Sequence, residues 1–296
     1  MGCNYRSKRN RPIFSFIPTA LFTGLFTAFW GIFAGIVFST VGAAGGLLPS
    51  FAFISFFDVQ NPNDVKLMSQ IIVLAVALTF VPGYLQRNAL VWPLGILLGI
   101  GGLFGAYTGS SISGKYLNDM GAFIPLFGVF TLLIALQIIW KLYQKRNAVS
   151  EDTAQTSVQN MLFVGRDLQF FYGLKKYKIT AYSPIMAGFS IAFIASIFGG
   201  GGGFLLVPYM VSILRLPMHI IPGTAAIAII MSTVVSMGNY VSLGAKTETS
   251  LLIPMLIGAL LGAYLGPIIN KRAKNSWLQA ALAVILMMIA VKYIIF

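Results

Sequence analysis

The sequence SIFGGGGGFLLVP at residues 196–208 places five consecutive glycines between two apolar segments. Glycine costs about 1 kcal/mol per residue relative to alanine inside a helix. A helix that enters this stretch is therefore predicted to end at the glycines, and a short helix is predicted to begin at Phe204. The stretch STVGAAGGLLP at residues 39–49 predicts the same interruption earlier in the chain, with a short helix from Leu47.

The composition indicates a membrane protein. Of the 296 residues, 57% are hydrophobic and only 9% are charged, whereas a soluble domain carries about 25% charged residues. So few charges cannot cover a water-facing surface, which excludes a soluble globular enzyme. The single cysteine, Cys3, has no partner in the chain, which excludes a disulfide-stapled secreted module.

Ten apolar segments follow one another along the chain, and eight of them are long enough to span a bilayer. The other two, 47–57 and 204–214, hold about 11 residues each, or roughly 16 Å of helix, which is half of a hydrocarbon core. Both directly follow a glycine cluster. The predicted organisation is a basic tail (1–12), a first transmembrane repeat (13–143), a cytoplasmic linker (144–180) and a second transmembrane repeat (181–296).

The two halves are related by a shift of 157 residues without a gap. The shift places Gly42 on Gly199 and Gly46 on Gly203, and it places the Gly-Ala-Tyr-x-Gly motif at 105–109 on the one at 262–266. We interpret this last motif as a helix-packing device. The predicted fold class is an all-α polytopic membrane protein with two homologous repeats, each of four spanning helices plus a short Gly-led half helix.

Two topologies follow from the short segments. If they re-enter and return, each half crosses the membrane four times, and 14 of the 20 Lys and Arg residues lie on the side of the linker and the N-terminus. If they complete a crossing, each half crosses five times, the repeats are inverted, and the split is 12 to 8 with the N-terminus outside. The excess of basic residues places the linker in the cytoplasm in both, and both alternatives stay open at this stage.

The glycine breaks predict a binding site for a small anion. A helix N-terminus carries about half a positive charge and binds anions, and glycine lets backbone amides approach a ligand without a Cβ in the way. Close helix packing is the alternative reason for the glycines. The candidate binding residues are the glycines of the breaks and small polar residues near them: Ser39, Gly42, Gly45, Gly46, Ser69, Gln70, Ser196, Gly199, Gly202, Gly203, Thr224 and Asn239.

The ionisable residues argue against other functions. All seven acidic residues lie in or beside predicted loops, whereas carriers of protons or cations commonly bury a carboxylate in the membrane. No cluster of His, Cys, Asp and Glu suggests a metal, and no catalytic set or phosphate-binding loop suggests an enzyme, an ATPase or a cofactor. The basic residues lie in juxtamembrane stretches, which indicates contact with the lipid bilayer rather than with nucleic acid.

Three basic residues lie at segment edges, where Lys66 and Arg215 could attract anions and His219 could titrate near neutral pH. Lys66 and Arg215 are expected to extend their charged ends to the interface while their stems stay apolar. His219, the single histidine, is expected to lie at the interface as well.

At its glycine clusters the chain resembles the TauE/SafE family of membrane permeases, also called sulfite exporters. The resemblance covers about residues 20–296 and is carried by Gly199 to Gly203 with Pro208, by Gly223-Thr224, and by the motif at 262–266. The chain departs from the family pattern at Ala225, where a serine is usual, and at Pro49, which follows Gly46 by three residues instead of five. The resemblance implies two related halves and transport of small sulfur-containing anions such as sulfite, sulfoacetate or thiosulfate.

These observations together predict a secondary transporter of the plasma membrane. It would move a small anion by alternating access at the paired glycine breaks. An anion channel and a non-transporting membrane scaffold are the alternatives. The sequence leaves the oligomeric state, the coupling ion and the direction of transport open.

Overall fold

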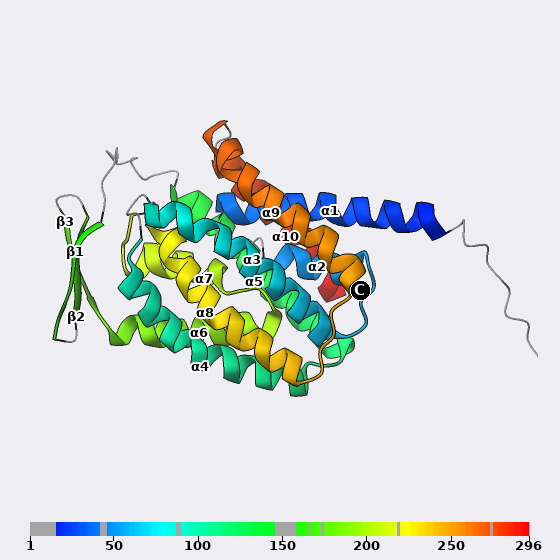
Figure 1. The fold of residues 1–296 in the computed structure, drawn as a ribbon, viewed down its shortest axis with the longest axis horizontal. Helices are drawn as coiled ribbons and strands as arrows, with labels where there is room; N and C mark the ends of the chain where they lie inside the picture. Colours follow the sequence, from blue (N-terminus) through cyan, green and yellow to red (C-terminus); the bar gives the residue numbers. More distant parts are fainter. Residues whose placement is uncertain are drawn as a thin grey trace, which may run out of the picture.

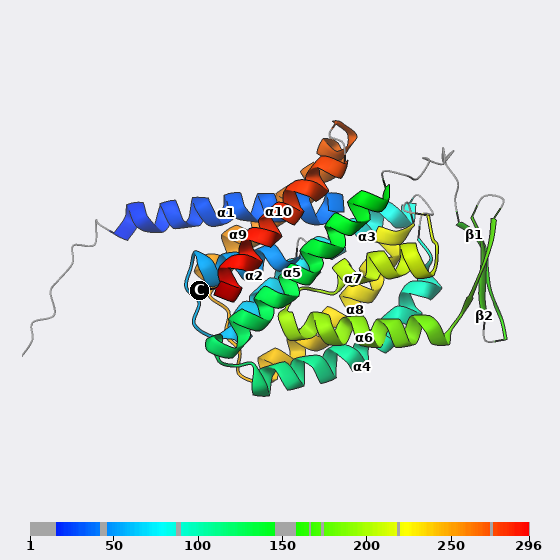
Figure 2. The ribbon, with the colours of Figure 1, turned by 180° about the vertical axis from the view of Figure 1, so that it is seen from behind.

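The computed structural model describes residues 16–41, 46–86, 90–145, 158–165, 167–172, 175–217, 220–272 and 275–295. The described residues are mostly helical, with one small sheet at one end of the helical bundle (Figures 1 and 2). In chain order the elements are α1 (Phe16–Val41), α2 (Leu47–Ser55), α3 (Pro62–Gln86), α4 (Trp92–Tyr116), α5 (Met120–Lys145), β1 (Val158–Val164), β2 (Asp167–Tyr172), β3 (Lys175–Thr180), α6 (Tyr182–Phe198), α7 (Gly203–Pro208), η3 (Tyr209–Ile213), α8 (Ile221–Ser242), α9 (Thr249–Arg272) and α10 (Asn275–Ile295).

Six helices in the described part of the chain are long and apolar enough to cross a membrane: α1, α3, α4, α5, α8 and α9. The apolar segments Tyr182–Phe198 and Gln279–Ile295 were also predicted to span the membrane. Each is one residue shorter than the 18-residue minimum length that the six spanning helices meet. A 17-residue helix rises about 26 Å, close to the thickness of the hydrocarbon core. The structure therefore supports a polytopic helical membrane protein.

Glycine faces join the helices into two tight seams. In the seam between α1 and α9, Gly258 packs on the carbonyl of Ala28, and Gly262 packs on that of Ile32. In the seam between α4 and α6, Gly101 packs on the carbonyl of Ile185, and Gly105 packs on that of Phe189. A Cβ at any of these glycines would collide with backbone. The Gly-Ala-Tyr-x-Gly motif lies in both seams, so its interpretation as a packing device is confirmed.

The two seams share one numbering offset. Ala28 and Ile185 differ by 157 positions, and so do Gly101 and Gly258. In both seams the partner position rises along with the glycine position, so the two helices of each seam run parallel.

The helices α3 and α8 lie side by side in the bundle and run in opposite directions (Figure 1). Near the start of α3, Gln70 bonds to Ser236 late in α8. Near the end of α3, Tyr84 packs on Gly223 early in α8. This antiparallel pair lies between the two seams, because α8 also packs on α4 and α3 also packs on α9.

The linker contains a sheet that the sequence analysis did not predict. Its strands form an antiparallel meander in the order β1-β2-β3. Leu168 and Phe170 alternate with more exposed residues along β2, which is the two-residue period of a half-buried strand, and Phe170 stacks on Tyr177. The all-α prediction is therefore corrected to a mostly helical chain with a small sheet in the linker, because charged residues in the linker masked a short alternating pattern.

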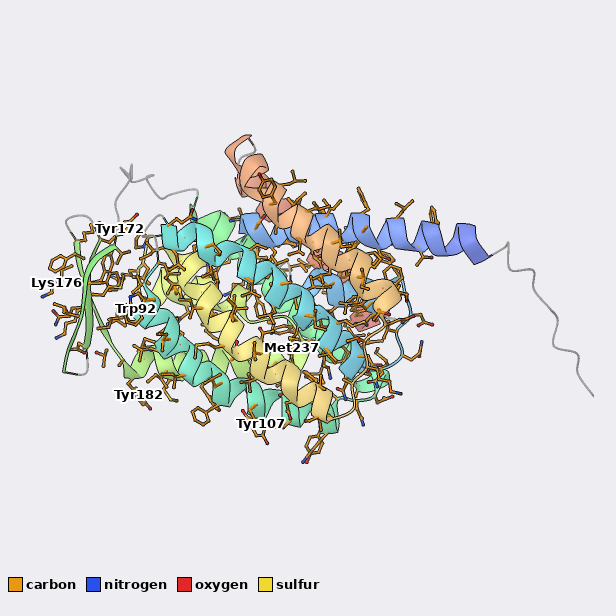
Figure 3. All side chains as sticks on the ribbon, viewed as in Figure 1. Trp92, Tyr107, Tyr172, Lys176, Tyr182 and Met237 are labelled. Carbon is orange, nitrogen blue, oxygen red and sulfur yellow. The ribbon has the colours of Figure 1, made fainter. Side chains whose placement is uncertain are left out.

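Exposed aromatic side chains mark the end of the bundle next to the sheet. Trp92 begins α4, Tyr182 begins α6, and both lie toward the sheet in Figure 3. Their side chains are exposed. Tryptophan and tyrosine are enriched where a membrane meets water, which agrees with a boundary of the bilayer at this end of the helices.

Candidate functional site

The second glycine cluster interrupts the helix as the sequence predicts. Helix α6 ends where Gly199 adopts a left-handed backbone with φ of +73°, and α7 starts after Gly202, whose φ is +75°. Between them Gly201 has φ of +71°. Residues with a Cβ rarely adopt this region, so glycine is required at these positions. The amides of Gly199 and Gly200 both donate to the carbonyl of Ala195, which ends α6.

The first cluster lies between the end of α1 at Val41 and the start of α2 at Leu47. Gly42 and Gly45 fall outside the described residues. Gly46 is described, and it precedes α2 with a right-handed backbone.

The two breaks meet in the interior. A Cβ placed on Gly46 would lie 2.5 Å from the carbonyl oxygen of Gly200 and 2.9 Å from Cγ2 of Val73. The other γ-methyl of Val73 packs on Gly201. Helix α3 thus forms a common wall beside both breaks.

A cavity of about 10 Å³ adjoins Gly46, and its lining is apolar, with Ala34, Phe38, Ile72 and Val76 among its residues. Such a volume holds about one water molecule. An oxyanion does not fit there, so the breaks are closed against one another in this arrangement.

Side chains from two other helices bond the last carbonyls of α6. The Tyr240 hydroxyl donates to the carbonyl of Ser196 at 2.7 Å, and the Ser113 hydroxyl donates to that of Ile197 at 2.8 Å. The carbonyls at a helix end have no partner within the helix. These two bonds therefore attach the rim of the second break to α8 and α4.

Two predicted binding residues on α3 face different neighbours. Ser69 donates to the carbonyl of Val65 and accepts a bond of 2.8 Å from Ser50 of α2. Gln70 donates through Nε2 to the hydroxyl of Ser236 at 2.9 Å. Both side chains are buried.

Two buried polar atoms among the described residues have no hydrogen-bond partner: Oε1 of Gln70 and Oγ1 of Thr233. Most buried polar atoms in proteins are bonded, so each exception calls for an explanation.

Three predicted binding residues make contacts away from the second break. Ser39 donates to the carbonyl of Ile36 within its own helix. Thr224 accepts from the amide of Val91 and donates to the carbonyl of Ile220, which fixes the start of α4 against α8. Asn239 donates to two serine hydroxyls of α4, as the bonds to Ser110 and Ser111 show. The structure gathers Gly46, Ser196, Gly199, Gly202 and Gly203 at the breaks instead, and Gln70 lies on α3 between Lys66 and Val73, which border them.

The expectation that Lys66 reaches the interface is wrong. Lys66 is 0% exposed. Its ammonium donates to the carbonyl of Leu117 at 2.8 Å and to Oδ1 of Asn63 at 3.3 Å. It also lies over the ring of Phe123, 4.6 Å from the centroid, and 5.7 Å from that of Tyr240. Carbonyl, amide and aromatic groups thus replace water around the charge.

Lys66 borders the second break directly. A Cβ on Gly199 would lie 2.8 Å from the Cα of Lys66. Sequence reasoning noted this residue but left it out of the site, and the signal that points to it is the spacing of Lys66 and Gln70, which places both on one face of α3. Arg215 is exposed and lies outside the helices, and His219 falls outside the described residues. No group of three or more His, Cys, Asp or Glu that could hold a metal occurs in the described ranges.

Comparison with known proteins agrees with this architecture. The model of the family Sulfite exporter TauE/SafE matches residues 13–293. The chain is 24% identical over 271 residues to the probable membrane transporter protein YunE of Bacillus subtilis (strain 168), which covers 89% of this chain and 94% of the relative. It is also 24% identical over 246 residues to a probable membrane transporter protein of Xylella fastidiosa (strain 9a5c), covering 83% and 84%.

No solved structure matches the chain significantly. The family match covers nearly the whole chain, and six helices are able to cross a bilayer. The protein is therefore a multi-pass membrane transporter of the plasma membrane that belongs to the sulfite exporter TauE/SafE family.

Proposed function

We propose that the protein is a secondary transporter of a small anion, a sulfur oxyanion or an organosulfonate, and that it works by alternating access at the two glycine breaks. The observation that carries the proposal is the contact between Gly46 and Gly200. Segments more than 150 positions apart in sequence bring their helix interruptions to one point inside the bundle. Interrupted helices that meet at the midplane are typical of transporter binding sites.

In this proposal the transmembrane halves at 13–143 and 181–296 are repeats with inverted orientation in the membrane. Helices α3 and α8 correspond under the shift of 157 residues, and they run antiparallel. The shared offset of the two glycine seams supports the same correspondence. These directions favour five crossings in each half, with the linker at 144–180 in the cytoplasm and both chain ends outside.

Cysteine labelling tests this topology. In a variant that lacks Cys3, Lys176→Cys on β3 should react only with reagents that enter the cytoplasm. Lys292→Cys near the end of α10 should react with an impermeant reagent from outside. Labelling of Lys292→Cys from the cytoplasm would restore the alternative with four crossings, and labelling of Lys176→Cys from outside would overturn both.

The substrate class rests on the family and on the chemistry of the breaks. A sulfite or sulfonate group presents three oxygen acceptors and a negative charge, which suits backbone amides that glycine leaves accessible. The small void beside Gly46 means that the described arrangement is the closed form of the carrier in this proposal. Access from either side then requires the breaks to separate.

The test is transport by the purified protein in liposomes. A panel of sulfite, thiosulfate, sulfate, sulfoacetate and taurine is measured for uptake and efflux. Saturable flux of at least one sulfur oxyanion or sulfonate is expected. Large unitary currents would favour an anion channel instead, and the absence of both flux and binding would favour a scaffold.

A further inference from the structure

One side of the contact between α3 and α8 carries a band of buried polar residues, which we call the polar strip. It consists of Lys66 and Gln70 on α3 and of Thr233, Ser236 and Tyr240 on α8, each of which is less than a tenth exposed. Lys66 lies opposite Tyr240, and Gln70 lies opposite Ser236. The antiparallel register continues to place Thr233 opposite Val73, which packs on Gly201.

The strip holds a positive charge without a carboxylate. Among the described residues an ion pair joins Lys178 to Asp167 in the sheet, and none joins Lys66 to an acidic side chain. Two of the three N–H bonds of the ammonium are used by Leu117 and Asn63. A cation inside a membrane protein is costly and marks a functional site by default.

The strip also holds polar atoms that nothing in the described chain satisfies. Oε1 of Gln70 and Oγ1 of Thr233 have no partner. A serine hydroxyl can donate as well as accept, so a half-turn of the Gln70 amide keeps its bond to Ser236 and places an N–H donor where the unpartnered Oε1 lies. The strip can then offer an amide and a hydroxyl donor, with the Lys66 ammonium about one to two helical turns away along α3.

Packing alone does not require this polarity. Under the shift of 157 residues the strip positions 66, 70 and 233 correspond to Gly223, Ile227 and Val76, none of which is polar or charged, whereas Ser236 corresponds to Thr79. Gly223 still packs closely on Tyr84 of α3. The second break borders only the polar side, since Gly199 packs on Lys66 and Gly201 packs on Val73.

We propose that the polar strip binds the transported oxyanion, with Lys66 as its positively charged group and with Gln70 and Thr233 as donors to its oxygens. This inference rests on the proposed function and adds to it a charged side-chain site in one half of the chain. The ligand class is a small anion with several oxygen acceptors on one centre, such as sulfite or a sulfonate. A single site per chain follows, because the corresponding positions in the other half carry no charge.

The first experiment compares Lys66→Met with Lys115→Met. Lys115 ends α4 and is exposed to solvent, so its loss removes the same charge outside the strip. Sulfite flux is measured in liposomes, and the sulfite-induced rise in melting temperature is measured in detergent. Lys66→Met should raise the KM for sulfite by about 10- to 100-fold, the range expected for one charge-assisted hydrogen bond, and should abolish the thermal shift. Lys115→Met should match the wild type in both.

A purely structural Lys66, which only bonds the end of α4, gives a different result. Lys66→Met would then melt at a lower temperature but keep the KM and the sulfite-induced shift of the wild type. That outcome overturns the inference while leaving the proposed function intact. A wild-type protein without flux or thermal shift for any anion of the panel overturns the proposed function itself, and the inference with it.

Thr233→Val provides the test if Lys66→Met does not fold. The replacement keeps the shape of the side chain and removes a hydroxyl that has no partner, so the protein without anion should melt no lower than the wild type. We expect its KM for sulfite to rise by about 3- to 10-fold, as for the loss of a neutral hydrogen bond. An unchanged KM in this stable variant overturns the inference.

Discussion

The two ends of the contact between α3 and α8 show how differently one pair of helices can be packed. At the end that holds Lys66, the interface is polar, and two of its atoms have no partner. At the other end, Gly223 packs on Tyr84 beside a void of about 20 Å³ whose lining includes Ala77, Ala226 and Ile229. Both ends bring the helices together, so the polar residues are not needed for the crossing. The buried polar residues at the Lys66 end are therefore a feature of one end of this contact and not of helix packing in general.

The largest effect is expected at the second break, which borders the polar end. Gly202→Leu adds a side chain at a left-handed position next to Ala195 and should reduce sulfite flux to background while the protein still inserts. Gly238→Leu is the matched control, because Gly238 lies on the exposed side of α8 with no neighbouring atom within 4 Å. Flux is measured in liposomes at equal protein content. Normal flux with Gly202→Leu would mean that the break takes no part in transport.

A smaller effect should distinguish the two ends by stability. Val76→Thr places a hydroxyl at the apolar counterpart of Thr233, and burying it should lower the free energy of unfolding by about 1–2 kcal/mol. Thr233→Val should leave the free energy of unfolding unchanged or raise it by up to about 1 kcal/mol, since no bond is lost. Melting temperatures in detergent without anion measure both. A marked loss of stability in Thr233→Val would show that its hydroxyl is bonded in the protein, and the contrast between the ends would disappear.

The smallest effect is expected in the sheet, far from either end. Hydrogen bonds from Lys178 and Thr180 hold the pKa of Asp167 below its usual value. A carboxyl group with a lowered pKa stabilises the folded protein fully at any pH above the ordinary pKa of an aspartate. This stabilisation is lost only when the pH falls to the lowered pKa of Asp167. Asp167→Asn should therefore change flux less than about twofold at pH 7, and the ratio to the wild type should stay constant down to pH 5. A pH-dependent difference in that range would connect the sheet to transport.

Much of the fold follows from the sequence. The predicted apolar segments and the observed helices agree closely along the chain, because long apolar runs and glycine clusters determine where membrane helices begin and end. The sheet was missed, because its alternating residues are few and lie among lysines.

The candidate site was predicted in part. Glycine runs indicate a break without any knowledge of neighbours, so residues 199–203 were found from the sequence. Lys66 was not assigned to the site, because it lies four residues after the start of α3 and a lysine at that position usually reaches the interface. Its burial depends on α5 and α8, which supply Phe123 and Tyr240. Thr224 and Asn239 were assigned to binding because they are polar within membrane segments, but the described contacts use them to join α8 to α4.

The side chain of Val73 links the two halves mechanically. Its two methyl groups rest on different interruptions, one on Gly46 and the other on Gly201. Any movement that widens one gap displaces a group that also supports its counterpart. If the breaks separate during transport as proposed, this single isopropyl group would couple the rearrangement on one side of the bundle to that on the other.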